Sequence, residues 1–476
     1  MMQPTSHRRR VLLRSLLAAS AGVPLVSMAQ SIPVLSEADL AHAVTLRDAG
    51  LKTSLAYDLM ASLVREVGPR PAGSPGDAMA VAWAQSHLRR LGFANVRADP
   101  VPLTVWQRGA TTVEVTAPEK RAVVAVALGN TVGTAEPGIE AEIAWYPDFQ
   151  ALRADSSDKA RGRIVFIDQK MDRSRDGSGY GRAVLARVAG AVEAARRGAL
   201  AVAIRSIGTD RDQIAHTGAM RYDPQVAQIP AVAVGVPDAD WMAERVAAGQ
   251  ALRMRVHMAR VPQLRAVTHN VIGEVPGTDL AKEVVLLGAH LDTWDITPGA
   301  QDDASGVGIV MAAAKVLLDA GRQPRRTVRV VLFGNEENGF DGARDYGQRY
   351  QAQPHQLLGE SDFGADRIWR FRARMRPEAQ PVIDAMSRVL APLGIEADGQ
   401  PGNPSPDASV LMRMRNWPAV ELTQDGTRYF DVHHTVNDTV ERVDPSSMPQ
   451  NVAAWAAVAW LAAQAGVAFG PIELTR

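Results

Sequence analysis

The chain has 476 residues, more than one hydrophobic core usually organises, so we expect two or three domains. Hydrophobic residues make up 46% and charged residues 22%, which excludes a disordered or fibrous chain, and the 52 basic residues balance 52 acidic ones, which gives nucleic acid no electrostatic reason to bind. The absence of cysteine excludes disulfides, thiolate metal sites and cysteine nucleophiles, so any metal must be held by carboxylates and the 10 histidines.

The first 29 residues have the pattern of an export signal. Three arginines at residues 8–10 precede an apolar stretch at residues 16–26, which is too short to span a bilayer, and small residues follow at positions 27–29. The pair Arg9-Arg10 resembles a twin-arginine signal, and an uncleaved membrane anchor is the alternative. Cleavage would remove four Arg and no acid, leaving 48 basic and 52 acidic residues. We expect an exported protein, periplasmic or secreted, without membrane contact after cleavage.

The next stretch predicts helices and then a change of pattern. Apolar spacing predicts helices over residues 36–66 and 77–91, with a loop rich in Gly and Pro at residues 68–76 between them. From about residue 110 to 260, short β-type runs alternate with one alanine-rich helix at residues 183–197. These runs lie at residues 112–115, 122–127, 163–167, 199–204 and 231–234. Because this stretch has its own turns and apolar runs, we interpret it as an inserted domain.

From residue 268 onward the pattern is α/β. Residues 284–287 and 327–333 are apolar enough for buried strands, and residues 307–319 form a helix between them. This alternation predicts a mostly parallel, mixed sheet flanked by helices. The predicted division is therefore a signal at 1–29, the first part of the main domain at 30–109, a β-rich insertion at 110–262 and the rest of the main domain at 263–476.

Polar side chains follow the predicted strands, where open α/β sheets bind ligands. They are His290, Asp292, Asp302, Asp303, Glu336, Glu337, Asp362, His433 and His434. Each alone has an ordinary structural explanation, such as a hydrogen-bonded histidine, a helix N-cap or a solvated charge pair.

Together these residues indicate a divalent metal. Neighbouring acids such as Asp302 and Asp303 cannot both ionise cheaply in a partly buried cleft without a cation, and these motifs contain no Lys or Arg. Histidine and carboxylate ligands without sulfur suit zinc in a hydrolytic site. Side chains two apart on a strand share a face, so we expect the Asp292 carboxylate to reach the ring of His290 and fix its tautomer.

The order His-x-Asp, Asp-Asp-x-Ser-Gly, Glu-Glu, Glu-Ser-Asp and His-Thr resembles the two-zinc peptidases, a family that includes aminopeptidases, glutamate carboxypeptidases and the transferrin-receptor ectodomain. Residues 288–295 and 433–439 are most similar to its carboxypeptidase Q-like members. Residues 68–76 resemble the family's Gly-Pro-Arg-x-x-Gly-Ser loop. The middle of the chain resembles a protease-associated domain inserted into the peptidase fold, at residues 162–167, 183–204 and 229–232. The likeness covers most of the chain after the signal.

This resemblance implies two zinc ions per chain. The implied ligands are His290, Asp302 and Asp362 for one ion and Asp302, Glu337 and His434 for the other, with Glu336 as general base and Asp292 as the partner of His290. His433 competes with His434, which directly precedes Thr as the family ligand does. Asp366 competes with Asp362, which the Glu-Ser-Asp string favours.

Three further residues are candidates for substrate contact. Tyr429 and Phe430 precede the histidine pair, and core packing is the alternative for both. The family commonly has a Ser-Asp-His-like string where this chain reads Pro406-Asp407-Ala408. The role of Asp407 is therefore open between a buried structural carboxylate and a substrate contact.

The implied activity is that of an exopeptidase that hydrolyses dipeptides or short peptides with free termini, and the family leads us to expect a homodimer. One alternative is a glutaminyl cyclase-like transferase, which uses this fold with one zinc. Another is a non-catalytic, receptor-like binding protein. The complete ligand set argues against both. The end of the peptide that is attacked and the preferred side chain are both left open.

Overall fold

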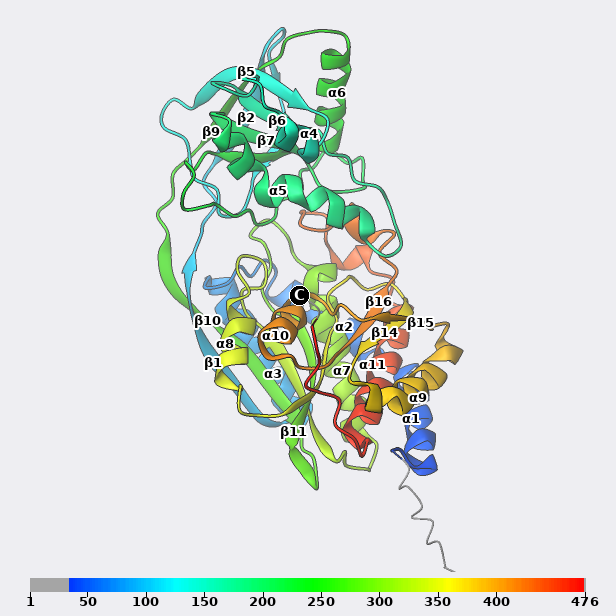
Figure 1. The fold of residues 1–476 in the computed structure, drawn as a ribbon. Helices are drawn as coiled ribbons and strands as arrows, with labels where there is room; N and C mark the ends of the chain where they lie inside the picture. The colour runs from blue at the N-terminus through cyan, green and yellow to red at the C-terminus, as the bar shows by residue number, and fades with distance from the viewer. Residues whose placement is uncertain (1–33, 475–476) are drawn as a thin grey trace, which may run out of the picture. The chain divides into compact units, whose positions relative to one another are not determined.

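Two eight-stranded sheets carry the fold (Figure 1). The computed structural model describes residues 34–474, and the predicted export signal lies outside these residues. Within residues 34–474, no helix is long and apolar enough to cross a membrane.

The first sheet is mixed, as the sequence predicts. Its central strands are parallel to one another, whereas β10 runs antiparallel to β12 and β14 runs antiparallel to β16. In spatial order it contains β1 (Ala94–Val105), β10 (Leu264–Val275), β12 (Arg326–Phe333), β11 (Leu280–His290), β13 (His355–Glu360), β16 (Ala419–Gln424), β14 (Ile368–Arg374) and β15 (Glu396–Pro401).

Helices cover both faces of this sheet (Figure 1). One face packs against α1 (Glu37–Gly50), α2 (Leu55–Glu66), α3 (Pro75–Arg90), α7 (Ser305–Asp319), α9 (Gln380–Leu390) and α11 (Met448–Gln464). The other packs against α8 (Asp341–Arg349) and α10 (Pro406–Arg415). In β11, Val285 and Leu287 enter the first core and Val284 and Leu286 enter the second. Burial on both faces explains why residues 284–289 of this strand are all apolar.

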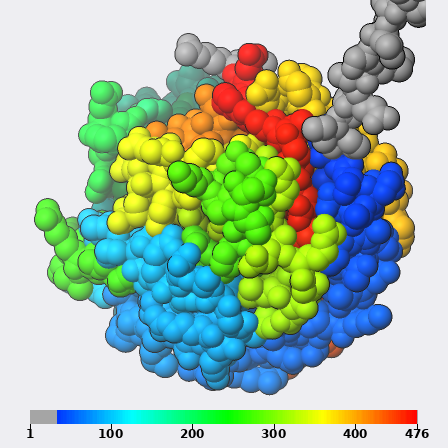
Figure 2. All heavy atoms as spheres, turned by 90° about the horizontal axis from the view of Figure 1, so that it is seen from below, coloured from blue at the N-terminus to red at the C-terminus, as the bar shows by residue number. Residues whose placement is uncertain are grey.

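The predicted helix over residues 36–66 is wrong in one respect, because the chain forms two helices there. A Cβ atom on Gly50, the last residue of α1, would lie 2.6 Å from the Cα of Ala453 in α11, so α1 ends in close backbone contact with α11. The turn at residues 51–54 then lets α2 pack against α7. The C-terminal segment also reaches this region. The N–H of Gly466 donates to the carbonyl of Val34 at 2.9 Å, and Figure 2 shows the C-terminal segment (red) beside the first described part of the chain (blue).

All strands of the second sheet come from residues 111–258. In spatial order they are β3 (Arg121–Ala122), β2 (Thr111–Ala117), β9 (Arg253–Met258), β5 (Ile139–Tyr146), β6 (Ile164–Ile167), β7 (Ala201–Arg205), β8 (Ala231–Val234) and β4 (Ala125–Ala127). One face packs against α4 (Phe149–Ala154) and α5 (Ser178–Arg196), and the other against α6 (Val236–Ala247). The chain leaves the first sheet through β1 and returns through β10, its antiparallel neighbour, with Val105 opposite Leu264.

The predicted strand over residues 122–127 is divided between β3 and β4. These two strands pair at opposite edges of the second sheet, β3 with β2 and β4 with β8. The strands β2 and β4 also contact each other, so the sheet curls and one short run of chain serves both edges.

Candidate metal centre

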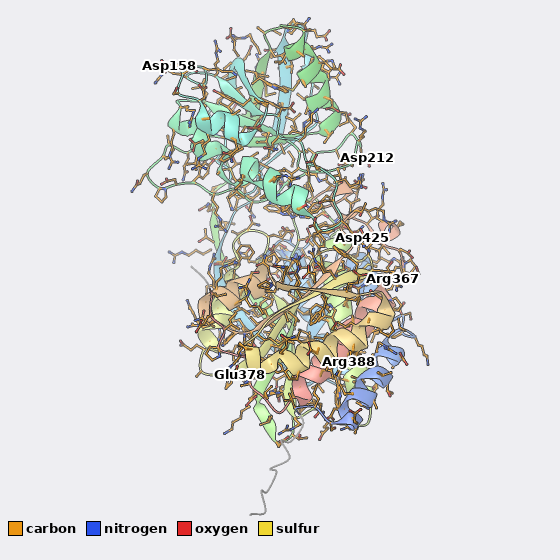
Figure 3. All side chains as sticks on the ribbon, turned by 45° about the vertical axis from the view of Figure 1, so that its right-hand side comes forward. Asp158, Asp212, Arg367, Glu378, Arg388 and Asp425 are labelled. Carbon is orange, nitrogen blue, oxygen red and sulfur yellow. The ribbon has the colours of Figure 1, made fainter. Side chains whose placement is uncertain are left out.

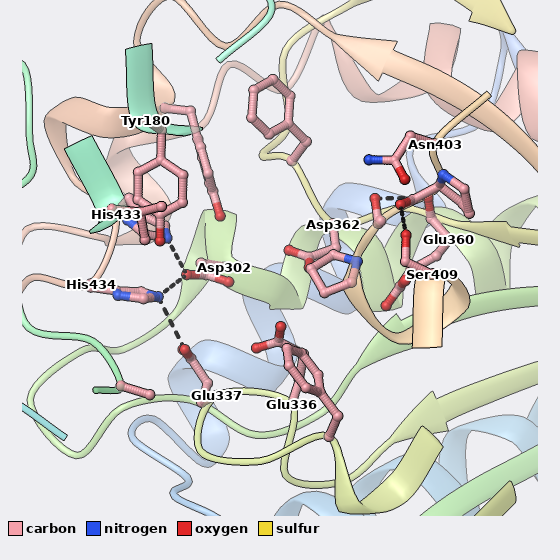
Figure 4. A pocket seen from close by; sticks show the side chains of 18 of the residues that line it. Tyr180, Asp302, Glu336, Glu337, Glu360, Asp362, Asn403, Ser409, His433 and His434 are labelled. Atoms are coloured by element: carbon pink, nitrogen blue, oxygen red, sulfur yellow. Dashed lines mark hydrogen bonds and ion pairs between the residues drawn. The ribbon is translucent and has the colours of Figure 1, made fainter. Parts of the chain in front are cut away.

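The predicted site residues converge at the carboxyl ends of three neighbouring parallel strands. Strand β11 ends at His290, and its neighbours β12 and β13 lead directly into Glu336-Glu337 and Asp362. Asp302 lies in the irregular turn that leads into α7, and His434 lies in the loop after β16. Parallel strands place their carboxyl ends at one edge, so segments far apart in sequence meet there (Figure 4).

Asp302 lies between two histidines. Its Oδ1 is 3.0 Å from the Nε2 of His290, and its Oδ2 is 3.3 Å from the Nε2 of His434. The Nε2 of His434 is also 3.0 Å from Glu337 Oε2, and the Nε2 of His290 is 3.7 Å from Asp362 Oδ1. The structure therefore brings all five predicted ligands together in two groups that share Asp302, and Figure 4 shows Asp302, Glu337, Asp362 and His434.

Two further side chains compete for the same positions. The Nε2 of His433 is 3.6 Å from Asp302 Oδ2, and its ring stacks on that of His434 with centroids 3.6 Å apart. Asp303 also lies within ligand distance of His290 and Asp362. Its two oxygens already accept hydrogen bonds from the backbone N–H groups of His290 at 3.1 Å and Gly306 at 3.0 Å. Asp303 thus fixes the backbone at His290 and Gly306. His433 is an alternative ligand to His434.

Asp292 orients His290 through a different atom from the one predicted. The Nδ1 of His290 lies 3.0 Å from the backbone carbonyl of Asp292 and 3.9 Å from its Oδ1. The carboxylate instead accepts a hydrogen bond from the backbone N–H of Glu336 at 3.0 Å. The strand ends at His290, so the chain turns there and the backbone carbonyl, rather than the side chain, faces the ring.

The electrostatics of the cluster fit bound cations. Burial raises the pKa of Asp292 and of Asp362 to about 7, and burial raises the pKa of Glu336 well above its ordinary range. Among the described residues, Asp302 Oδ2 and Glu337 Oε1 are buried without a hydrogen-bond partner. Buried carboxylates that lack partners are costly unless a positive charge compensates them. Two histidines and three carboxylates without sulfur form a donor set that suits zinc.

Two residues that support the centre escaped sequence reasoning. Asp438 is fully buried, and its carboxylate accepts hydrogen bonds from the backbone N–H groups of Gln301 at 2.7 Å and Asp302 at 3.1 Å. Arg70, also fully buried, donates to the backbone carbonyls of Leu291 at 2.6 Å and Pro298 at 2.8 Å. Both fix the loop between the first two ligands. The Gly- and Pro-rich composition around Arg70 was the only local indication of such a role.

A cavity of about 870 Å³ opens onto the metal cluster. Its wall is formed by residues of the first sheet and its loops and by residues that pack on the second sheet. The second sheet contributes Tyr180 and Arg187 of α5, and the loop after β16 contributes Tyr429 and Phe430. The ring of Tyr180 stacks on that of Phe430 with centroids 4.8 Å apart, and Figure 4 shows Tyr180 beside His433. Tyr429 and Phe430 therefore form part of the cavity wall.

Two other candidates lie outside the cavity and the cluster. Asp407 is fully buried and is not among the residues that line the cavity, which favours the buried structural carboxylate of its two predicted roles. It follows Pro406 in the first turn of α10. Asp366 pairs with Arg428 at 2.6 Å and does not join the metal cluster.

Comparison with known proteins gives a consistent result. Residues 270–459 match the profile of peptidase family M28. Carboxypeptidase Q from Bos taurus is 32% identical over 416 residues, which cover 87% of this chain and 86% of that protein. The crystal structure of a peptidase M28 precursor from Shewanella amazonensis SB2B superposes with a TM-score of 0.88 at 41% identity, covering 92% of this chain and 99% of that one. A zinc aminopeptidase from Bacillus subtilis shares the fold, with a TM-score of 0.58 at 18% identity, covering 86% and 95%.

Proposed function

Because the chain belongs to peptidase family M28, we propose that it is a zinc-dependent exopeptidase that holds two zinc ions in the cluster around Asp302. The observation that carries the proposal is that the two oxygens of one carboxylate face two different histidines. One oxygen of Asp302 lies 3.0 Å from the Nε2 of His290, and the other lies 3.3 Å from the Nε2 of His434. A carboxylate so placed can bridge two ions. The relatives support zinc, since one of them is a zinc aminopeptidase.

The proposed ligands are His290, Asp302 and Asp362 for one ion and Asp302, Glu337 and His434 for the other. Zinc in such a site supplies a Lewis acid that polarises the scissile carbonyl and makes water more acidic.

Glu336 is the proposed general base. It lines the cavity next to the ligand Glu337, and the hydrogen bond from its backbone N–H to Asp292 fixes its position. Its carboxylate takes a proton from the attacking water and then delivers that proton to the leaving amine. The burial that raises the pKa of Glu336 suits a group that must hold a proton between these two steps.

We further propose that the substrates are dipeptides or short peptides with free termini and that the protein is exported. The cavity supports the first proposal, because α5 of the second sheet forms part of its wall and limits the room for a long chain. The sequence pattern at residues 1–29 supports the second. The second sheet, in the role of a protease-associated domain, would then restrict access to the centre.

Glu336→Gln tests the base. This variant should bind zinc as the parent does, while kcat falls by about 10²–10⁴-fold, the range typical of lost general acid–base catalysis. Glu378→Gln is the matched control, because Glu378 is exposed in the short 3-10 turn Pro377–Ala379 and does not line the cavity (Figure 3). Peptidase turnover that survives in Glu336→Gln would contradict the assignment.

A dipeptide library tests the substrate class. The zinc-loaded protein should cleave free dipeptides and lose activity on substrates blocked at the recognised end, so N-blocked and C-blocked series identify that end. The zinc content should be measured on the same preparation. A content of one zinc per chain, with no cleavage of any dipeptide, would instead favour a transferase on this fold.

A further inference from the structure

The loop that carries His434 needs contacts from outside itself. It lies between β16 and α11 and contains only two short 3-10 turns, Tyr429–Asp431 and Val440–Arg442. His434 has a φ of 61°, in the left-handed region that residues other than glycine rarely adopt. Such a conformation persists only where the surroundings impose it.

The second sheet supplies these contacts through Thr217, in the segment between β7 and β8. The backbone N–H of Thr217 donates to the carbonyl of His434 at 3.2 Å, and the carbonyl of Thr217 lies 3.2 Å from the Nδ1 of His434. A carbonyl can only accept, so Nδ1 carries the hydrogen in this contact. The neutral ring then directs the lone pair of Nε2 toward Asp302 and Glu337, which is the tautomer that a metal ligand requires.

The preceding residue, His216, ties the same segment to the loop. Its ring is buried, with Nδ1 2.7 Å from the carbonyl of His433 and Nε2 2.6 Å from Asp210 Oδ1. Its backbone N–H donates to the hydroxyl of Ser206 at 3.0 Å. Asp210, His216 and the His433 carbonyl thus form one chain of contacts from the second sheet to the residue next to His434.

Two glycines in the segment between β7 and β8 make room for the buried side chains of His216 and Arg187. A Cβ atom on Gly208 would lie 2.3 Å from the Nε2 of His216, closer than any side chain tolerates. A Cβ atom on Gly218 would lie 2.2 Å from a guanidinium nitrogen of Arg187. Glycine at both positions lets the backbone pass close to the two buried side chains.

Other contacts between the second-sheet region and the loop, one of them from Arg173 before α5, are more exposed. Arg173 pairs with Asp431 at 2.6 Å, with side chains that are 41% and 30% exposed, and Asn437 donates to Asp212 at 3.0 Å. Figure 3 shows Asp212 on the part of the second-sheet region that faces this loop. Exposed ion pairs contribute little to stability, so the buried contacts of His216, whose side chain is 1% exposed, dominate the connection.

We propose that His216, held by Asp210, is a positioning residue for the metal centre. It fixes Thr217 against His434. The set of zinc ligands is therefore complete only when the segment between β7 and β8 contacts the loop that carries His434. The inference rests on the proposed function, because it takes His434 as a zinc ligand.

His216→Asn tests the proposal, with His257→Asn as the matched control. His257 belongs to the same sheet and also pairs with a carboxylate, Glu136 at 2.9 Å, but its side chain is 29% exposed and far from the loop contacts. Zinc affinity is measured by competition with a chromogenic chelator. We expect His216→Asn to weaken binding at one of the two sites by about 10- to 100-fold, as loss of an outer partner of a ligand typically does, and the control to leave both sites unchanged.

A structural readout separates positioning from general damage. In zinc-free protein, the amides of Thr217 and Thr435 should exchange hydrogen faster in His216→Asn than in the control, while the melting temperatures of the two variants agree. Should His216→Asn fail to fold, Gly208→Ala displaces the same ring without changing its chemistry. Asp210→Asn keeps a hydrogen-bond acceptor for the His216 ring, so this variant should retain most of the zinc affinity of the parent.

The outcomes are distinct. Unchanged zinc affinity and amide exchange in both His216→Asn and Gly208→Ala would overturn this inference and leave the proposed function intact. A parent protein that binds no zinc, and whose peptidase activity zinc does not restore after chelation, would overturn the proposed function itself.

Discussion

The carboxylate of Asp292 accepts a hydrogen bond from the backbone N–H of Glu336 at 3.0 Å, across a gap of 44 residues in the sequence. The backbone carbonyl of Asp292 lies 3.0 Å from the Nδ1 of His290. One residue therefore orients both a proposed ligand and the proposed base. Displacement of Asp292 would disturb metal binding and proton transfer together.

Asp292→Asn keeps an acceptor for the Glu336 N–H but removes the negative charge beside His290. We expect kcat/KM to fall by about 10- to 100-fold, with a smaller loss than in Asp292→Ala, which also removes the acceptor. Steady-state kinetics on a dipeptide measure both effects. Asp295→Asn is the control from the same loop, since Asp295 is partly exposed and pairs with Arg108. Equal activity in Asp292→Ala and the parent would contradict this role.

Zinc removal should destabilise the protein, because the cluster then holds buried carboxylates without a compensating cation. Zinc at 100 times its Kd should stabilise the folded state by about 2.7 kcal/mol, visible as a higher Tm in differential scanning calorimetry. Magnesium should have little effect on Tm, since the histidine ligands favour zinc. His434→Ala should reduce the zinc-dependent rise in Tm, whereas His87→Ala, on the surface of α3, should retain it.

Acid should destabilise the fold through His355, which lies far from the metal ligands at the start of β13. Its ring stacks on Trp417 at 3.8 Å, and its Nε2 lies 2.8 Å from the hydroxyl of Tyr346. Burial lowers the pKa of His355 from 6.5 to about 3, so the folded protein keeps the ring neutral where the unfolded chain takes up a proton. This contribution is complete above pH 6.5 and is lost as the pH falls toward 3, by up to about 1.4 kcal/mol per pH unit.

Urea unfolding at pH 7, 6 and 5 measures this dependence. His355→Gln should be less stable at pH 7 and should show a flatter decline of the unfolding free energy with falling pH. His257→Gln, at an exposed site, should keep the slope of the parent. A parent slope that His355→Gln leaves unchanged would assign the acid sensitivity to other groups.

Gly359→Ala should destabilise the strand that leads to Asp362. The added Cβ would lie 2.3 Å from the ring of the fully buried Trp455, and overpacking of this kind costs about 1–3 kcal/mol. Gly181→Ala in α5 is the opposite case, because nothing lies within 4 Å of the new methyl group and alanine favours a helix by about 1 kcal/mol. Denaturant unfolding of the two variants should therefore give free-energy changes of opposite sign.

The sequence predicted the parts of the fold in which a strand is buried on both faces. The carboxyl-terminal halves of β11 and β12, residues 284–289 and 330–333, are apolar for that reason, so the strand ends, and the ligands just beyond them, could be located. Strand β9 was missed because it alternates exposed arginine with buried methionine and valine over only six residues. Strand β1 was missed because it lies at the edge of the sheet and contains Pro100 and Pro102, which usually argue against a strand.

The residues of the candidate site likewise fall into those that the sequence could locate and those that it could not. Ligands that directly follow a strand are visible in the sequence because local pattern places them. Asp438, Arg70 and His216 act through backbone atoms of distant segments, and neither periodicity nor spacing in the sequence assigns them these roles. Their roles depend on tertiary contacts, and only the folded structure shows these.

The pairing of β1 with β10 has a consequence for how the protein is made. Every strand of the second sheet lies between these two in the sequence, so a ribosome completes that sheet before β10 and the central strands of the first sheet emerge. During this interval β1 has no partner strand, and the charges of Arg97 and Asp99 protect it from pairing with other chains. His434 is synthesised later still. Thr217, which contacts it, and His216, which contacts the neighbouring His433, precede it in the sequence, so the second sheet is complete as a chain before the last ligand of the metal centre is made.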